Sequence, residues 1–140
     1  MKAVNIIAVY SVSGDQILMC RRRKEPYKGR SNLVGGKLET GEDGLAAAYR
    51  ELEEETGVTA SDITLVHVMD FLYHVYDIRL EVYAGKLRHE VAVHGDENEL
   101  YWAELTQDFH DTEKFAGESN LGHILAVIER NKESIFGGNA

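Results

Sequence analysis

Three glutamates lie close together in a segment that the sequence predicts to be helical. Glu51, Glu54 and Glu55 are three and four positions apart, so their side chains would project from one helix face, within about one turn of each other. Like charges at this spacing destabilise a helix by roughly 0.2–0.5 kcal/mol per pair. A divalent cation would offset that repulsion, because clustered carboxylate oxygens, with water, are ligands that Mg²⁺ accepts. The spacing therefore predicts a magnesium site.

Glycines and basic residues precede these glutamates. Gly36 and Gly41 permit backbone conformations that a side chain would block, so the loop can fold over the helix N-terminus. Nearly half of the 15 Lys and Arg residues fall between Arg21 and Lys37. In an extended segment Arg21 and Arg23 point to one side, and one of them, with Lys37, is expected to face phosphates. The alternative is a solvated basic loop.

Two helices are predicted from apolar residues at helical spacing. The first covers residues 44–56, with Asp43 as its N-cap and Gly57 as its C-terminal cap. Its buried stripe is expected to contain Leu45, Ala48, Tyr49 and Leu52. The acidic face borders this stripe, so the glutamates are expected at the rim of a cleft. The second helix covers residues 121–128, and two residues are available to cap it, Ser119 and Asn120.

Strands are predicted where β-branched and aromatic residues are concentrated. They cover residues 4–12, 16–22, 63–75, 78–87 and 101–103. The first two flank the turn sequence Ser13-Gly14-Asp15 and so form a hairpin. The order of strands, helix, strands and helix predicts an α/β fold of the α+β kind. We expect an α/β/α sandwich with a mixed β-sheet between helices, in a single domain over residues 1–140.

The composition limits the partners and the compartment. A formal net charge of −9 argues against a nucleic-acid polymer as partner, because such a partner needs a broad basic surface. No apolar stretch approaches the roughly 18 residues of a membrane span, and no signal-peptide pattern is present. The single cysteine, Cys20, lies in an apolar run and is expected to be buried and reduced. We therefore expect a cytoplasmic protein without membrane contact, whereas pairing with a second copy stays open.

Residues 36–58 resemble the Nudix box. The segment fits glycine, five residues, glutamate, seven residues, then Arg-Glu-apolar-X-Glu-Glu-X-Gly-apolar, without a departure. With the N-terminal hairpin and the length, the chain is identified as a member of the Nudix hydrolase family, similar to its MutT-type branch. The resemblance implies a Nudix-like α/β/α sandwich and hydrolysis of a nucleoside diphosphate linked to another moiety. The expected reaction converts a nucleoside triphosphate, oxidised or not, to the monophosphate and pyrophosphate, with Mg²⁺ or its substitute Mn²⁺.

The resemblance also implies roles for individual residues. The Mg²⁺ ligands would be the backbone carbonyl of Gly36 and the carboxylates of Glu51, Glu54 and Glu55. Arg50 would orient a box glutamate, and Glu42 would brace the loop against the helix. The general base stays open between a box carboxylate, Glu54 or Glu51, and an acid in the segment Asp96-Glu97-Asn98-Glu99. In that segment Glu97 and Glu99 are the candidates for a base or a further ligand.

The substrate also stays open. Asn32 and Asn120 are similar to positions where MutT-type enzymes place an asparagine that contacts a purine, although each also suits a turn or a cap. Tyr73 and Tyr76 keep a dinucleoside polyphosphate hydrolase open. An ADP-ribose hydrolase is less favoured, because that branch carries a proline after the box and none follows Pro26. A Nudix-fold sensor that binds nucleotide without cleaving it is disfavoured by the intact glutamates.

Overall fold

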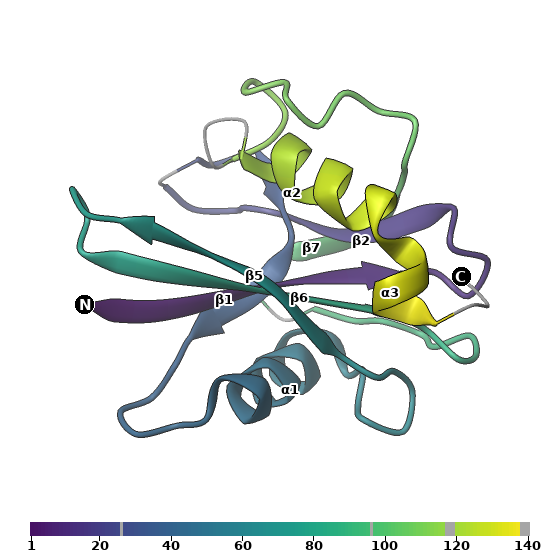
Figure 1. The fold of residues 1–140 in the computed structure, drawn as a ribbon. Coiled ribbons are helices and arrows are strands. Elements are labelled where there is room, and N and C mark those ends of the chain that lie inside the picture. Colours follow the sequence, from purple (N-terminus) through teal and green to yellow (C-terminus); the bar gives the residue numbers. More distant parts are fainter. Residues whose placement is uncertain (26, 96, 117–119, 138–140) are drawn as a thin grey trace.

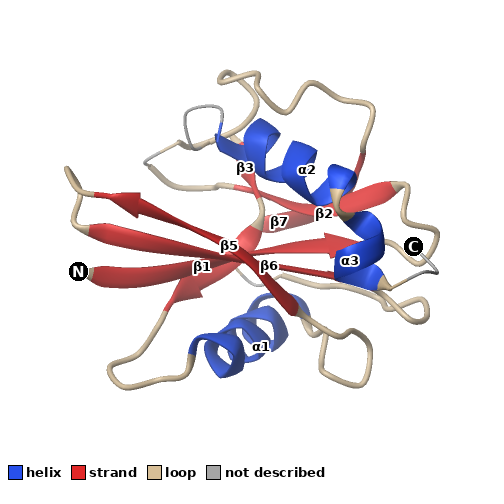
Figure 2. Ribbon diagram, in the orientation of Figure 1, coloured by secondary structure: helices blue, strands red, loops and turns tan. Residues whose placement is uncertain are grey.

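The elements of the chain form three layers (Figure 1). A β-sheet lies in the middle, α1 (Gly44–Thr56) covers one face, and α2 (Asn120–Arg130) with α3 (Lys132–Phe136) covers the other. Figure 2 shows the same layers with helices and strands in different colours. The predicted α/β/α sandwich with a sheet between helices is confirmed. This computed structural model describes four stretches of the chain, residues 1–25, 27–95, 97–116 and 120–137.

The sheet is mixed and forks along one edge of its central strand. Its strands are β1 (Lys2–Tyr10), β2 (Gln16–Arg21), β3 (Ser31–Asn32), β4 (Val34–Lys37), β5 (Val66–Tyr73), β6 (Ile78–Lys86) and β7 (Glu99–Glu104). The order is β3-β2-β1-β6-β5, with β4 paired to β1 and β7 paired to β2. β1 runs parallel to β6, and every other pair is antiparallel. On its other edge, β1 meets β4 at residues 4–7 and β2 at Tyr10, so the predicted hairpin diverges beyond its turn.

α1 has the bounds that the sequence predicts, because each end carries a local cap. The Asp43 carboxylate accepts a hydrogen bond from the Ala46 N–H at 3.1 Å. At the other end Gly57 has a φ of 83°, and its N–H donates to the Glu53 carbonyl at 2.9 Å. Glycine adopts this left-handed conformation without a steric penalty. Residues 44–56 are therefore fixed as a helix by interactions that a sequence pattern can show.

The buried stripe of α1 differs from the predicted one. Leu45 is 41% exposed, whereas Ala47 is fully buried. Beneath the first turn the sheet presents polar groups, since a Cβ atom on Gly44 would lie 2.4 Å from a carboxylate oxygen of Glu81 and 2.5 Å from the hydroxyl of Tyr83. The helix approaches these groups with its glycine, and Leu45 points away from them. The prediction that Leu45 belongs to the core is therefore wrong.

Each face of the sheet has its own apolar core. The core under α1 includes Ile7, Val9, Leu18, Val34, Leu52, Val58, Ile63 and Leu65. The core under α2 includes Tyr10, Ile17, Met19, Val82, Phe109, Phe115, Ile124, Leu125 and Ile128. Cys20 belongs to the first core and is 6% exposed, and burial raises the pKa of its thiol to about 11. The prediction of a buried cysteine is confirmed.

Several elements depart from their predicted bounds. β5 begins at Val66 rather than at Ile63, and β7 extends beyond residues 101–103 on both sides. β5 lies at the end of the strand order and carries a bulge between His67 and Met69. α3 was not predicted; its Phe136 contacts the Tyr10 ring edge-on, with centroids 5.1 Å apart. Within the described part of the chain, none of the helices is long and apolar enough to cross a membrane.

The two leucines of α1 give a matched test of this packing. Leu52 is fully buried, whereas Leu45 is 41% exposed on the same helix. We expect Leu52→Ala to lower the free energy of unfolding by about 2–5 kcal/mol, because it leaves a cavity in the core. Leu45→Ala should change it by less than about 0.5 kcal/mol. Urea denaturation followed by circular dichroism measures both, and equal losses would contradict the observed helix orientation.

Candidate active site

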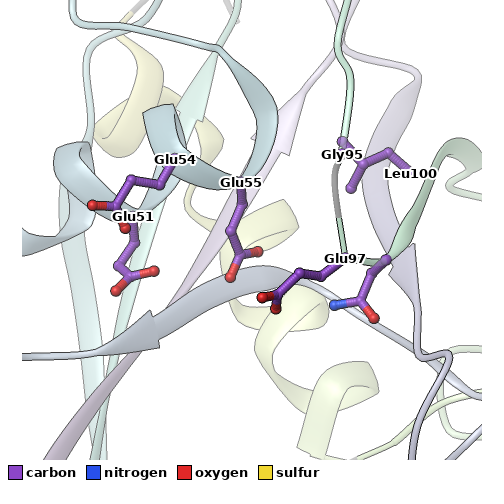
Figure 3. Close-up of a pocket in the computed structure, with 7 residues that line it drawn as sticks. Glu51, Glu54, Glu55, Gly95, Glu97 and Leu100 are labelled. Carbon is purple, nitrogen blue, oxygen red and sulfur yellow. The ribbon is translucent and has the colours of Figure 1, made fainter.

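A pocket of about 230 Å³ lies beside the C-terminal half of α1. Its lining residues are Glu51, Glu54, Glu55, Gly95, Glu97, Asn98 and Leu100. Three of the acids come from α1, and Glu97 comes from the segment between β6 and β7. Figure 3 shows the carboxylate of Glu97 turned toward that of Glu55. The structure thus brings four of the predicted acidic residues to one pocket from two separate parts of the chain.

The guanidinium of Arg50 connects the helix to the loop before it. Its Nε and Nη2 atoms donate to the two carboxylate oxygens of Glu42 at 2.8 and 2.9 Å. Its Nη1 donates to Glu51 at 3.0 Å and to Glu54 at 3.2 Å. Nη2 also donates to the backbone carbonyl of Lys37 at 3.2 Å. One side chain therefore orients two of the clustered glutamates and fixes the end of β4.

Glu42 closes the loop between β4 and α1. Besides its paired contact with Arg50, its carboxylate accepts a hydrogen bond from the Glu39 N–H at 2.9 Å. The hydrogen bonds from Arg50 lower the pKa of the Glu42 carboxyl to about 2. A carboxylate held in this way ties the loop to the helix, which is the contact expected of a brace.

Glycines at the end of β4 let two of the acids approach the backbone closely. A Cβ atom on Gly36 would lie only 2.3 Å from an oxygen of Glu51, so this carboxylate rests directly against the strand. The Gly35 N–H donates to Glu55 at 3.4 Å. Any other residue at position 36 would displace Glu51. The glycine therefore has a steric role in the pocket.

Glu55 carries the electrostatic cost of the cluster. Burial raises the pKa of its carboxyl to about 7, and the nearby carboxylates of Glu51, Glu97 and Glu54 act in the same direction. The Gly35 N–H opposes these effects without cancelling them. Negative charge at this position is therefore poorly compensated by the protein alone. A cation in the pocket would compensate it, and carboxylate oxygens are suitable donors for a hard divalent ion.

The acids are not gathered into a ready-made ligand set. Among the described residues, no group of three or more His, Cys, Asp or Glu side chains stands in an arrangement that could hold a metal ion. The hydrogen bonds explain this. Arg50 binds Glu51 and Glu54, whereas Glu55 turns to the Gly35 N–H. The donor chemistry fits a divalent cation, and the side chains would have to turn toward one another to bind it.

A second cavity, of about 530 Å³, lies on the α2 side of the sheet. It is lined by Val4, Ile6, Arg22, Tyr27, Asn32, Lys37, Tyr73, Tyr76, Ile78, Leu80, Ala116, Asn120, Leu121 and Ile124. Three of the predicted substrate-contacting residues, Asn32, Lys37 and Asn120, therefore line one cavity. The Asn120 amide nitrogen donates to the Tyr73 hydroxyl, and the Asn32 side-chain oxygen accepts from the Leu33 N–H at 2.8 Å. The arrangement offers an apolar and aromatic volume with two oriented amides.

Three other predicted residues lie elsewhere. The pairing of β2 with β7 places Arg21 opposite Glu99, and their side chains form an ion pair at 3.0 Å. Neither residue lines the acidic pocket or the second cavity. Arg23 uses its backbone N–H to contact the Asn98 side chain at 3.4 Å, and Arg22 is the arginine that lines the second cavity. Alternation along a strand does not predict that Arg22 reaches the cavity, because β2 ends at Arg21 and the residues after it are outside the regular strand. Asp96 and Ser119 lie outside the described residues.

The fold and the acidic helix together define the class of protein. A family model described as the NUDIX domain matches residues 1–124. The chain therefore belongs to the NUDIX domain family, and the family predicted from the box is confirmed. An ADP-ribose pyrophosphatase of Methanocaldococcus jannaschii is 36% identical over 81 residues, which are 53% of this chain and 48% of that protein. The matched segments span 48% or less of the length of the curated relatives.

Solved structures share the fold. A structure from an analysis of the MutT proteins of Aliivibrio salmonicida and Vibrio cholerae superposes with a TM-score of 0.69 at 21% identity. The match covers 92% of this chain and 98% of that one. An Ap4A hydrolase of C. elegans superposes with a TM-score of 0.75 at 18% identity, covering 96% of this chain and 100% of that one. At these identities the likeness establishes the architecture, and the substrate is a separate question.

The contact between Glu42 and Arg50 predicts a dependence of stability on pH. In the folded protein the pKa of the Glu42 carboxyl is about 2, below its ordinary value of 4.5. The contact therefore stabilises the fold fully above pH 4.5. That contribution is lost as the pH falls from about 4.5 through about 2. We expect Glu42→Gln to unfold at lower urea than the wild type at pH 7, with the difference shrinking toward pH 2. A difference that stays constant over this range would contradict the assignment.

Proposed function

We propose that the chain is a Mg²⁺-dependent pyrophosphohydrolase that cleaves a phosphoanhydride of a nucleoside diphosphate linked to another moiety. The reaction we favour converts a nucleoside triphosphate, canonical or oxidised, to the monophosphate and pyrophosphate. The observation that carries this proposal is the acidic pocket, in which Glu55 has a pKa raised to about 7 among Glu51, Glu54 and Glu97. A polyphosphate is repelled by such a pocket unless cations intervene.

The proposed metal ligands are the carboxylates of Glu51, Glu54 and Glu55 and the backbone carbonyl of Gly36. Bound Mg²⁺, or Mn²⁺ in its place, would neutralise phosphate oxygens and lower the pKa of a bound water. Arg50 contacts Glu51 and Glu54 and so limits the positions that their oxygens can occupy. This support is consistent with a role in orienting ligands.

The two cavities suggest how a nucleotide lies across the sheet. β4 is paired to β1, and its Gly36 lies against Glu51, which lines the acidic pocket. Lys37, the last residue of β4, lines the second cavity. A base held on the α2 side would direct its phosphates past Lys37 and Arg22 toward the acids. These two cations would then stabilise negative charge on the phosphates.

Glu97 is our candidate for the general base. It approaches from a different element than the metal-binding glutamates, and it lines the same pocket. Glu51 and Glu54 each accept a hydrogen bond from Arg50, so one oxygen of each carboxylate is already engaged. Glu97 would take the proton of the attacking water, with Glu54 as the alternative. We further propose a cytoplasmic location and a single catalytic domain, supported by the buried free Cys20 and by the two cores on one sheet.

The acids of the pocket can be tested against a neighbour on the same helix. We expect Glu51→Gln, Glu54→Gln and Glu55→Gln each to lower Mg²⁺-dependent pyrophosphate release from a nucleoside triphosphate by about 10²–10⁴-fold. Glu53→Gln is the control, because this exposed residue does not line the pocket, and it should leave the rate near that of the wild type. Activity that survives in the three variants, or full turnover in excess chelator, would falsify the metal assignment.

The second cavity predicts an effect on substrate binding. Loss of a hydrogen bond to a base costs about 1 kcal/mol, so Asn32→Ala and Asn120→Ala should each raise KM by about 5–10-fold with a smaller change in kcat. Asn131→Ala is the control, since its side chain contacts the Val127 carbonyl away from both cavities. Steady-state kinetics with the best substrate measure this. An unchanged KM in both variants would remove the two asparagines from the site.

A dinucleoside polyphosphate is the second candidate substrate. Tyr27, Tyr73 and Tyr76 line the cavity on the α2 side, and Tyr76 is 63% exposed. Exposed aromatic rings suit stacking against a second base. A hydrolysis panel of canonical and oxidised nucleoside triphosphates, dinucleoside polyphosphates and ADP-ribose, with products resolved, decides between them. Tight nucleotide binding without cleavage of any member would favour a sensor instead.

A further inference from the structure

A buried amide lies in the middle of the sheet, close to the acidic pocket. Asn5 is fully buried in β1, a strand whose other buried residues are apolar or aromatic. Its side-chain oxygen accepts a hydrogen bond from the Gly36 N–H at 3.0 Å. Among the described residues, its side-chain nitrogen has no hydrogen-bond partner. The orientation of the amide is fixed, because only the oxygen can accept from an N–H.

Asn5 belongs to a polar row that crosses three strands. The register places it opposite Gly36 of β4 on one side and opposite Glu81 of β6 on the other. Glu81 is also buried; it accepts hydrogen bonds from the Tyr83 hydroxyl at 2.8 Å and from Arg79 at 2.9 Å. Within the apolar core under α1, this row presents polar groups to the helix, together with the Tyr83 hydroxyl.

α1 spans the row from end to end. Its first residue, Gly44, lies against Glu81, and Glu51, seven positions later, lies against Gly36. Seven residues of helix extend about 10 Å, which matches two strand spacings of about 4.8 Å. Between these two contacts lie Ala47 and Ala48, both fully buried. Small residues in the middle allow the helix to lie close to the row, so both of its contacts form together.

The Asn5 hydrogen bond and the Glu51 carboxylate meet at the same residue, Gly36. A Cβ atom at position 36 would fall 2.3 Å from the carboxylate, so a small shift of this backbone changes the space that Glu51 occupies. The Asn5 side-chain oxygen accepts from the Gly36 N–H and so holds the Gly35–Gly36 peptide, which directly precedes the Gly36 carbonyl. An unpartnered buried amide nitrogen destabilises the fold, and an apolar side chain would avoid that cost. Stability alone therefore does not explain an asparagine at this position.

We propose that Asn5 is a positioning residue, which holds the Gly36 backbone by its N–H against the Glu51 carboxylate and so sets the geometry in which the Gly36 carbonyl and the Glu51 carboxylate bind a divalent cation. This inference rests on the proposed function for the identity of the bound ion. It adds a residue outside the box, on a different strand, that acts on the pocket through a backbone contact. Asn5 itself lines neither the acidic pocket nor the second cavity.

The test compares two buried polar groups of the same strand. Asn5→Val removes the acceptor and keeps a residue that suits a strand. Tyr10→Phe is the control, because the Tyr10 hydroxyl is also a buried polar group of β1 and lies on the opposite face of the sheet. Mn²⁺ binding is measured by calorimetry without nucleotide. Amide exchange at Gly36 is measured by NMR, and kcat and KM are measured with the best substrate of the panel.

For Asn5→Val we expect Mn²⁺ affinity to fall by about 10–100-fold, as for other residues that orient metal ligands. The Gly36 amide should exchange at least about tenfold faster, since it has lost its acceptor. kcat should fall while KM for the nucleotide changes by less than about threefold. Tyr10→Phe should match the wild type in all of these measurements. Asn5→Ala, which is smaller than the original residue, carries the same expectations if the valine is not accommodated.

The proposal is overturned if both Asn5 variants bind Mn²⁺ within twofold of the wild type, or if exchange at Gly36 does not change. It is also overturned if both variants fail to fold by circular dichroism, because Asn5 then serves the core alone. Absence of hydrolysis by the wild type across the panel would defeat the proposed function. Mn²⁺ affinity and amide exchange would still decide the role of Asn5 in that case.

Discussion

The pocket depends on the pairing of one cation with several acids that would otherwise repel one another. Arg50 donates to Glu42, Glu51 and Glu54 and to the carbonyl of Lys37. Without a positive charge, the carboxylates at the end of α1 would disfavour the helix and separate from the loop. Glu55 is outside this network, and its pKa is raised to about 7. The protein compensates part of the negative charge and leaves the remainder near the pocket.

The sheet determines where this uncompensated negative charge lies. β4 pairs with the start of β1 and β2 with its end, so β4 and β2 diverge along the same edge of β1. The glycines of β4 therefore lie at the edge of the acidic pocket. One face of this short strand contacts Glu51, and its last residue, Lys37, borders the cavity under α2. A single strand of four residues thus connects an acidic pocket with an aromatic one. The layers on each side supply the walls.

Local signals in the sequence were sufficient for the helix that carries the acids. Asp43 and Gly57 cap α1 through contacts within four residues, so its bounds match the prediction. The spacing of the glutamates in the box likewise predicts that they cluster, because residues three and four apart share one face of a helix. The buried face was predicted less well. Leu45 is exposed since the residues beneath the first turn, Glu81 and Tyr83, come from a strand distant in the sequence.

Contacts between distant segments account for the other differences. Arg21 and Glu99 are 78 positions apart and pair because β2 and β7 are neighbours, which no local pattern reveals. Asn5 appears in the sequence as a polar interruption of an apolar strand, and its significance depends on the register with Gly36. An asparagine within a strand of buried apolar residues is the signal that was available. Only the strand pairing identifies its partner.

The bulge in β5 interrupts the regular edge of the sheet. β5 ends the strand order, and its backbone between His67 and Met69 departs from regular pairing with β6. A bulge increases the local twist and displaces the N–H and C=O groups that an incoming strand would need in register. This part of the β5 edge is therefore a poor template for edge-to-edge addition of a further strand, on a hairpin that also exposes the apolar side chains of Leu72 and Val75.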